Sequence, residues 1–276
     1  ESDHSSIAVA ALIRDELPHA TFLTALRRGN VRGALDMGLA PGVLPGRTAI
    51  DNPSSALDDI WGYTPSIKGL DTTGMLQAAA EGKIRTLVLL GADPLSDFPD
   101  RNLAAEAIQR AETVISLDNF LTASSAQADI ILPTTAYGEQ GGTTTNIEGR
   151  ISRLTQKITP PGSVRDDWMI ATELAWRLGG DLNLTSKEQI WREIEQVAPS
   201  HAGVTVERIL SEEAREGILV QESSVEYIFP SVQEPPIADG YGLRLISGRK
   251  LWDASTTTSM SPSLRPLAEA PVLKVH

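Results

Sequence analysis

The clearest pattern in the chain is a set of short apolar runs separated by helix-spaced apolar positions. Three runs predict strands, at residues 86–90, 113–117 and 130–132. The first run is continuously apolar and ends at Gly91, which predicts a strand buried on both faces of a parallel sheet. Between the first two strands, Leu103, Ala107 and Ile108 fall on one face of a helix. This order predicts an α/β fold with an open, mostly parallel, Rossmann-like sheet and flanking helices.

Helix-spaced apolar positions predict further helices on both sides of this centre, at residues 5–17, 75–81, 166–178 and 187–197. Gly82 follows the second of them, as glycine commonly does after a last turn. Ser186 and Gln189 predict a capping box at the start of the last one. Apolar residues on most sides of helix 166–178 predict that it is largely buried. Residues 21–26 predict one more strand, followed by a loop rich in glycine and proline.

The composition of the chain changes after residue 225. Proline and glycine are frequent in residues 226–242, which predicts a linker. Residues 243–276 then begin with a new apolar run and predict the start of another unit. We therefore expect an α/β region over residues 1–225, a linker, and an incomplete final unit. A first residue other than methionine and an apolar run at the end suggest a piece of a longer protein.

The charge of the chain excludes some classes of partner. The formal net charge is −12, and no cluster of lysine and arginine of the kind that binds nucleic acid phosphates is present. No apolar run approaches the ~20 residues that cross a bilayer, and no secretory signal pattern is visible. We predict neither a nucleic acid partner nor direct membrane insertion.

The chain contains no cysteine, which excludes disulfides and thiolate-held zinc or iron–sulfur clusters within it. The four histidines are far apart in the sequence, and none forms a pair with metal-ligand spacing. We therefore predict no metal site, and exposed histidines or histidines with a partner in the core. No arrangement of serine, histidine and aspartate indicates a catalytic triad, so no catalytic residue is predicted.

Four motifs follow one another over about 65 residues, and their order and spacing are more specific than any one of them. They are Leu90-Gly91-Ala92-Asp93-Pro94, Leu117-Asp118-Asn119-Phe120-Leu121-Thr122, Ala128-Asp129-Ile130-Ile131-Leu132-Pro133, and Glu139-Gln140-Gly141-Gly142-Thr143 with Asn146-Ile147-Glu148-Gly149-Arg150. This series resembles the molybdopterin oxidoreductase family. Residues 243–252 resemble the opening of the last, barrel-like domain of that family, so the fold would include the start of a truncated β-barrel-like domain.

Within this family, residues 28–38 and 44–47 look most like the large iron–sulfur subunit of bacterial NADH-quinone oxidoreductase (respiratory complex I). The resemblance implies a structural part of the peripheral arm, on the cytoplasmic side of the bacterial plasma membrane. It implies the flavin- and NADH-binding subunit and neighbouring hydrophilic subunits as partners. The iron–sulfur clusters of such a subunit lie in a part that precedes these segments, so no cofactor is expected in this chain.

The resemblance also implies a set of cofactor-binding positions, where members loaded with a pterin cofactor hold its nucleotide half: Gly91, Asp93, Asp118 and Thr122. From the residues alone, Gly91 and Asp118 stand at strand ends, where open α/β sheets bind ligands. Asp93 departs from the family, whose cofactor-binding members usually carry asparagine there, and a carboxylate repels a pyrophosphate. These positions are therefore interpreted as vestigial. The plainer alternative is that Gly91 only ends a strand and Asp118 only accepts a hydrogen bond in a turn.

Two acidic residues and a glycine-rich stretch are interpreted as structural rather than functional. For Glu139 and Glu148 with Arg150, an internal ion pair that holds a long loop is favoured over acid–base catalysis. The stretch of residues 141–145 lacks the lysine of a phosphate-binding loop and is interpreted as an ordinary loop.

Three functions remain open at this point. The first is the non-catalytic part of the complex I subunit described above. The second is a fragment of a molybdenum- and pterin-dependent oxidoreductase, of the formate dehydrogenase or nitrate reductase type. The third is an independent α/β interaction domain, which the four ordered motifs disfavour.

Overall fold

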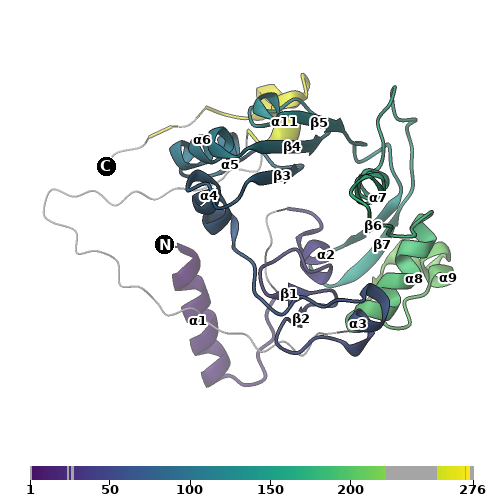
Figure 1. Cartoon of the computed structure of the whole chain (residues 1–276). Helices are drawn as coiled ribbons and strands as arrows, with labels where there is room; N and C mark the ends of the chain where they lie inside the picture. The colour runs from purple at the N-terminus through teal and green to yellow at the C-terminus, as the bar shows by residue number, and fades with distance from the viewer. Residues whose placement is uncertain (1, 24, 26–27, 222–253, 271, 274–276) are drawn as a thin grey trace, which may run out of the picture.

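A computed structural model describes residues 2–23, 25, 28–221, 254–270, 272 and 273. Two three-stranded sheets organise this part of the chain, one parallel and one antiparallel, each with its own helices (Figure 1). Within these residues no helix combines the length and the apolar character that crossing a bilayer requires.

The parallel sheet confirms the predicted α/β class. Its strands are β3 (Thr86–Leu90), β4 (Thr113–Asp118) and β5 (Ile130–Pro133), in the order β3-β4-β5. Helices α4 (Thr72–Ala80) and α6 (Arg101–Arg110) lie together on one side of this sheet (Figure 1). Their apolar faces and one face of the sheet form a core of buried residues, among them Leu76, Leu87, Leu89, Ile108 and Val114.

The other face of β3 is exposed in the part of the chain that the structure describes, so the prediction that residues 86–90 are buried on both faces is wrong. Leu87 and Leu89 are buried, whereas Val88 and Leu90 between them are 55% and 56% exposed. Successive side chains of a strand point to opposite faces. A continuously apolar run therefore gives no sign, in sequence alone, that one of its two faces lacks a covering layer.

The antiparallel sheet was not predicted. It consists of β6 (Gly142–Thr145), β7 (Arg150–Leu154) and β8 (Ile218–Leu219), with β7 in the middle. Helices α8 (Lys187–Val197), α9 (Val206–Leu210) and α10 (Glu213–Glu216) belong to the same unit. Its core includes Ile151, Trp191, Val204, Ile209 and Ile218. The interpretation of residues 141–145 as a loop is wrong, because most of them form the edge strand β6.

A smaller cluster precedes the parallel sheet in sequence. It contains α2 (Val31–Asp36), β1 (Val43–Leu44), β2 (Thr48–Ala49) and α3 (Ser55–Trp61). Buried Leu44 and Leu57 pack with Val197 at the end of α8. The indole N–H of Trp61 donates to Glu193 of α8 at 2.6 Å. Helix α8 therefore contacts this cluster as well as the antiparallel sheet.

Gly46, in the turn between β1 and β2, is required by both conformation and space. Its φ is +80°, and a Cβ there would lie 2.6 Å from Cδ of Pro199. Gly62 also has a positive φ, of +67°, but nothing lies near its missing side chain. We expect Gly62→Ala to lower the free energy of unfolding by about 1 kcal/mol, because only the backbone is strained. Gly46→Ala is expected to lower it by about 1–3 kcal/mol more, because of crowding. Urea unfolding of both variants measures the difference, and equal losses would contradict the role given to Pro199.

The remaining elements test the other helix predictions. They are α1 (Ser2–Glu16), α5 (Pro94–Asp97), η1 (Ser125–Gln127), α7 (Asp167–Arg177), η2 (Pro199–His201), α11 (Thr256–Met260) and η3 (Arg265–Leu267). The helices predicted at residues 5–17, 75–81, 166–178 and 187–197 are confirmed as α1, α4, α7 and α8. Ser186 caps α8 by accepting the backbone N–H of Gln189.

Three further predictions either differ from the structure or fall on residues that the structure does not describe. Residues 21–23 and 25 do not form a strand. Helix α7 is not largely buried, since Trp176 is 66% exposed and Ile170 alone of its residues is buried. The linker at 226–242 and the strand that would open a barrel-like domain fall within residues 222–253, outside the described part. Residues 254–270 contain α11 and η3 and no strand.

Candidate functional site at the carboxyl edge of the parallel sheet

The structure brings together the loops that follow the three parallel strands. Leu90 pairs with Leu117, and Asp118 pairs with Pro133. The backbone N–H of Gly91 donates to the carbonyl of Leu117 at 2.8 Å. Gly91 has a φ of +56° and open space where its side chain would be. The predicted positions Gly91 and Asp118 therefore lie at one edge of the sheet.

Asp93 points into the protein rather than out over this edge. It is buried, and its Oδ1 accepts the backbone N–H of Ser124 at 3.0 Å and the Ser124 hydroxyl at 2.5 Å. Burial raises the pKa of Asp93, but hydrogen bonds from Ser124, Ser96 and the backbone of Ala123 outweigh burial and lower it overall. Asp93 is thus a charged anchor that joins the loop after β3 to the loop after β4.

Thr122 and Asp118 are also engaged within their own loop. Thr122 is buried, and its hydroxyl lies 2.9 Å from that of Ser125, which also accepts the Thr122 N–H. Oδ1 of Asp118 accepts the N–H groups of Asn119 and Phe120 at 2.8 and 3.2 Å. These hydrogen bonds support the turn interpretation given to Asp118 from the sequence.

Residues at the start of α7 complete the edge, and the sequence did not single them out. The segment before α7 pairs with the end of β5 through Thr134 and Arg165. Asp166 accepts the Thr135 hydroxyl at 3.0 Å and forms an ion pair with Lys187, whose Nζ lies 2.5 Å from Oδ2. Asp166 occupies the N-cap position of α7, but its side chain makes no capping hydrogen bond. It joins the parallel sheet to the first residue of α8 instead.

Asp167 lies near two other carboxylates, so negative charge gathers at this edge. Burial raises its pKa, the neighbouring carboxylates of Asp166 and Asp118 raise it further, and a hydrogen bond from Thr134 opposes them. No cation is among the groups that shift it. Within the described part of the chain, no three acidic, histidine or cysteine side chains converge as metal ligands would.

Comparison with known proteins identifies the family. The profile of the Molybdopterin oxidoreductase family matches residues 27–177, more than half of the chain. The chain belongs to the molybdopterin oxidoreductase family. The family resemblance predicted from the four motifs is thereby confirmed, whereas the finer assignment to one kind of oxidoreductase is not decided by this match.

The similar proteins include several kinds of molybdopterin-family oxidoreductase. The chain is 29% identical over 250 residues to the alpha chain of NADPH-Fe(3+) oxidoreductase from Geobacter sulfurreducens, covering 90% of the chain and 28% of that protein. It is 30% identical over 254 residues to an NADH-quinone oxidoreductase subunit from Rhizobium meliloti, covering 90% and 29%. It is 30% identical over 196 residues to formate dehydrogenase H of Escherichia coli, covering 70% and 27%. The chain therefore spans less than a third of the length of each of these relatives.

A solved structure is also similar, that of acetylene hydratase from Pelobacter acetylenicus. It matches 60% of the chain and 23% of its own length, with a TM-score of 0.43 and 19% sequence identity.

The side chains at the edge do not fit the phosphates of the pterin dinucleotide that this family implies. Asp93 and Thr122 are turned inward and hydrogen-bonded, so neither offers a donor to a phosphate. The groups around Asp167 add negative charge, and Lys187, the near cation, is paired with Asp166. A pyrophosphate placed here would be repelled.

The molybdopterin-family motif at residues 139–150 has a structural explanation, which partly differs from the predicted one. Arg150 and Glu148 form an exposed ion pair at 3.3 Å, as predicted. Glu139 is not part of it, because its carboxylate accepts the N–H of Ala136 at 2.9 Å. Gly149 is needed for space, since a Cβ there would lie 2.7 Å from the guanidinium of Arg32. Arg32 of α2 also donates to the carbonyl of Ile147 at 3.3 Å, and its contacts hold the turn between β6 and β7 against α2.

The motif at residues 28–47 contains a buried charge cluster that the sequence did not reveal. Asp36 is fully buried, and its Oδ1 lies 2.8 Å from Nε of Arg47. Burial raises the pKa of Asp36, although Arg47 and Arg32 both act to lower it. Arg28, Asn30 and Arg32 also border a cavity of about 270 Å³ against the β6–β7 turn. The cluster joins α2 to the turn after β1.

His201 lies near this cluster, within reach of the charge of Arg47. It is 1% exposed, its Nδ1 is 2.9 Å from the Ser200 hydroxyl, and its ring packs against Trp191. Burial and then the charge of Arg47 lower its pKa to about 4. His201 is therefore a neutral core histidine with a hydrogen-bond partner, one of the two situations expected for the histidines of this sequence.

Proposed function

We propose that this chain is a structural, non-catalytic part of the large iron–sulfur subunit of an NADH-quinone oxidoreductase. In this proposal residues 1–225 form one α/β region, followed by a linker at 226–242 and the start of a barrel-like domain at 243–276. The region supports the peripheral arm, on the cytoplasmic side of the membrane, that passes electrons from NADH through iron–sulfur clusters to quinone. Its partners are the flavin- and NADH-binding subunit and the neighbouring hydrophilic subunits.

The observation that carries the proposal is that the edge residues form hydrogen bonds within and between the loops of the edge. Asp93 is bonded to Ser124, Thr122 to Ser125, and Asp118 to the backbone that follows it. A binding site for a nucleotide keeps polar groups directed at the ligand. We interpret Gly91, Asp93, Asp118 and Thr122 as inherited positions that now stabilise the carboxyl edge of the sheet. The similarity to the NADH-quinone oxidoreductase subunit from Rhizobium meliloti over 90% of the chain agrees with this assignment.

A second candidate is a fragment of a molybdenum- and pterin-dependent oxidoreductase. The 30% identity to formate dehydrogenase H over 70% of the chain favours it as much as the match to the Rhizobium meliloti protein favours the first. Under this candidate, the nucleotide half of the pterin would lie beside Gly91 and Asp118. The cofactor supplies two-electron redox chemistry at its metal when bound, and the residues of this chain would only position it.

Metal analysis separates the two candidates. We expect the purified native complex to contain iron but no stoichiometric molybdenum or tungsten. The measurement is mass spectrometry of the metals together with oxidative conversion of any pterin to its fluorescent form. A stoichiometric amount of either metal, or a pterin released from the protein, would overturn the structural proposal and support the second candidate.

Replacement of Asp118 tests the same proposal through activity. In the assembled complex, Asp118→Asn is expected to change the rate of NADH oxidation by less than about twofold, because the hydrogen bonds of the Asp118 side chain stay within its own loop. Asp97→Asn, which alters an exposed carboxylate in the same unit, is the matched control. Subunit content is measured in parallel to confirm assembly. A large loss of turnover in an Asp118→Asn complex of normal composition would contradict the proposal.

A further inference from the structure

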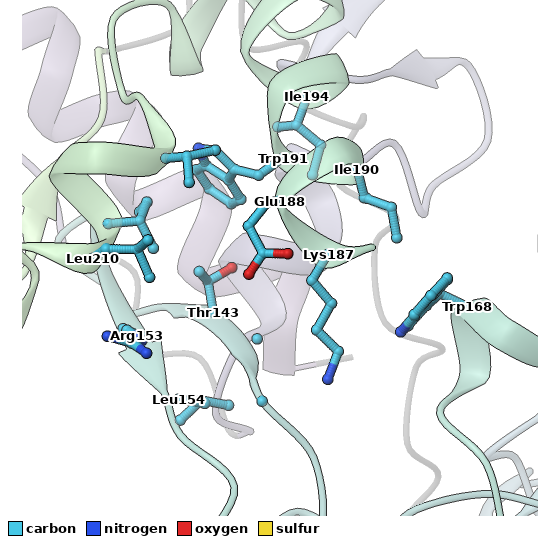
Figure 2. A pocket seen from close by; sticks show the side chains of 14 residues that line it. Thr143, Arg153, Leu154, Trp168, Lys187, Glu188, Ile190, Trp191, Ile194 and Leu210 are labelled. Atoms are coloured by element: carbon cyan, nitrogen blue, oxygen red, sulfur yellow. The ribbon is translucent and has the colours of Figure 1, made fainter. Parts of the chain in front are cut away.

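A cavity of about 330 Å³ lies between the strands β6 and β7 and the helices α7, α8 and α9 (Figure 2). Residues of α8 and α9 pack with Ile151 of β7 in the core of the antiparallel unit, and the cavity adjoins this core. Its apolar walls come from α7, α8 and α9, with Trp168, Ile190, Trp191, Ile194, Ile209 and Leu210 among the lining residues. The volume is at the lower end of the range found for small-molecule sites, which are mostly apolar with a few polar groups.

Arg153 supplies a cation at the rim of this cavity. It pairs with Thr143 across the strands and lies on the same face of β7 as Ile151, which is fully buried against the helices. Arg153 is exposed, and its guanidinium has neither an ion pair nor a hydrogen bond to any part of the chain that the structure describes. An apolar cavity beside an unpaired guanidinium is complementary to an anion that carries an apolar body.

The other two charged residues of the lining are already engaged. Lys187 is paired with Asp166. The carboxylate of Glu188 is held by its own backbone N–H and the Ser186 hydroxyl, which lower its pKa, with smaller contributions from Arg192 and Lys187. Figure 2 shows Glu188 and Lys187 at the start of α8, with Trp168 beyond them on α7. Glu188 therefore keeps its negative charge and adds one carboxylate to the lining, while Lys187 is paired, so Arg153 is the cation of the lining that is left for an anionic head group.

We propose that this cavity binds a small amphipathic carboxylate, whose apolar body lies between α8, α9 and the sheet and whose carboxylate pairs with Arg153. The indole of Trp191 packs in the adjoining core and donates to the carbonyl of Val204 at 2.6 Å, so the wall is held in place without a ligand. The proposal does not depend on the proposed function, because neither Arg153 nor the apolar walls include the positions Gly91, Asp93, Asp118 and Thr122 on which that function rests.

Isothermal titration of the purified chain with octanoate, octanol and octylamine tests the proposal. All three have the same apolar body, and they are used below the concentrations at which they aggregate. Octanoate is expected to bind at one site and more tightly than octanol, with octylamine weakest. Arg153→Gln is expected to weaken octanoate binding about tenfold and to leave octanol binding unchanged. Arg153→Lys retains most of the octanoate affinity because it keeps the charge.

Two further variants identify the site. Leu210→Trp fills part of the cavity from a half-exposed position and is expected to weaken binding of all three compounds. Arg101→Gln removes an exposed arginine on α6 and leaves every affinity unchanged. Unchanged circular dichroism and melting temperature confirm that each variant is folded. The proposal is overturned if octanoate does not bind, if octylamine binds more tightly than octanoate, or if Arg153→Gln affects octanoate no more than Arg101→Gln does.

Discussion

Replacing Asp36 with alanine is expected to lower the free energy of unfolding by about 3 kcal/mol, because removal of one member of a buried ion pair leaves the other charge without its partner. Asp36 is fully buried, and the side chain of Arg47 is only 21% exposed. The carboxylate is also near the charge of Arg32. Water cannot fully replace the lost carboxylate at this depth. Urea unfolding of the purified protein measures the change.

The pair of Glu148 and Arg150 provides the matched comparison. Its two side chains are 59% and 43% exposed, so Glu148→Ala is expected to change the free energy of unfolding by less than about 1 kcal/mol. Asp36→Asn keeps the shape of the side chain and isolates the effect of its charge from that of its volume. If Asp36→Ala cost no more than Glu148→Ala, the cluster at Asp36 would not be a stabilising contact between α2 and the turn after β1.

The parallel sheet and its helices could be predicted because their signals are local. The apolar runs at residues 86–90 and 113–117 match β3 and β4, and the helix spacing between them matches α6. The exposure of one face of β3 could not be predicted, since it depends on which elements pack there rather than on the strand itself. The antiparallel sheet was missed because β6 is rich in glycine and threonine, and β8 is only two residues long.

The location of the candidate site could be predicted, but the use of its residues could not. Gly91 and Asp118 meet because the carboxyl ends of parallel strands lie at one edge of a sheet, which follows from the strand order alone. The direction of the Asp93 side chain depends on Ser124, a residue 31 positions later. The sequence pointed to repulsion of a phosphate by Asp93, whereas in the structure Asp93 is an internal anchor. The charge of the edge comes from Asp118, Asp166 and Asp167 instead.

The motifs at residues 28–47 illustrate how a family pattern can be mainly structural. Gly46 is fixed by its positive φ and by the closeness of Pro199, and Asp36 by its ion pair with Arg47. The contact of Gly46 with Pro199 is not visible as a local pattern, because Pro199 is more than 150 positions from Gly46 in the sequence. Sequence similarity between this segment and other family members can therefore arise from a shared packing arrangement as well as from a shared chemistry.

The second large effect is a loss of stability in mild acid that depends on His201. Its pKa in the folded protein is about 4, against an ordinary value of 6.5. Between these two pH values the unfolded chain binds a proton at this residue that the folded protein does not bind. The free energy of unfolding therefore falls as the pH is lowered through this window, by about 3 kcal/mol from His201 alone. Asp36 and Asp167, whose pKa values are raised, contribute in the opposite direction.

A comparison of variants isolates the histidine from these carboxyl groups. The free energy of unfolding is measured in urea at several pH values between about 4 and 7 for the unaltered protein and for His201→Asn. The variant keeps a polar group near Ser200 but cannot bind a proton, so the difference between the two proteins is expected to shrink as the pH falls. His19→Asn removes an exposed histidine and should leave the pH dependence unchanged. A difference between His201→Asn and the unaltered protein that stays constant with pH would mean that His201 titrates alike in the folded and unfolded states. The lowered pKa of His201 in the folded protein would then have to be abandoned.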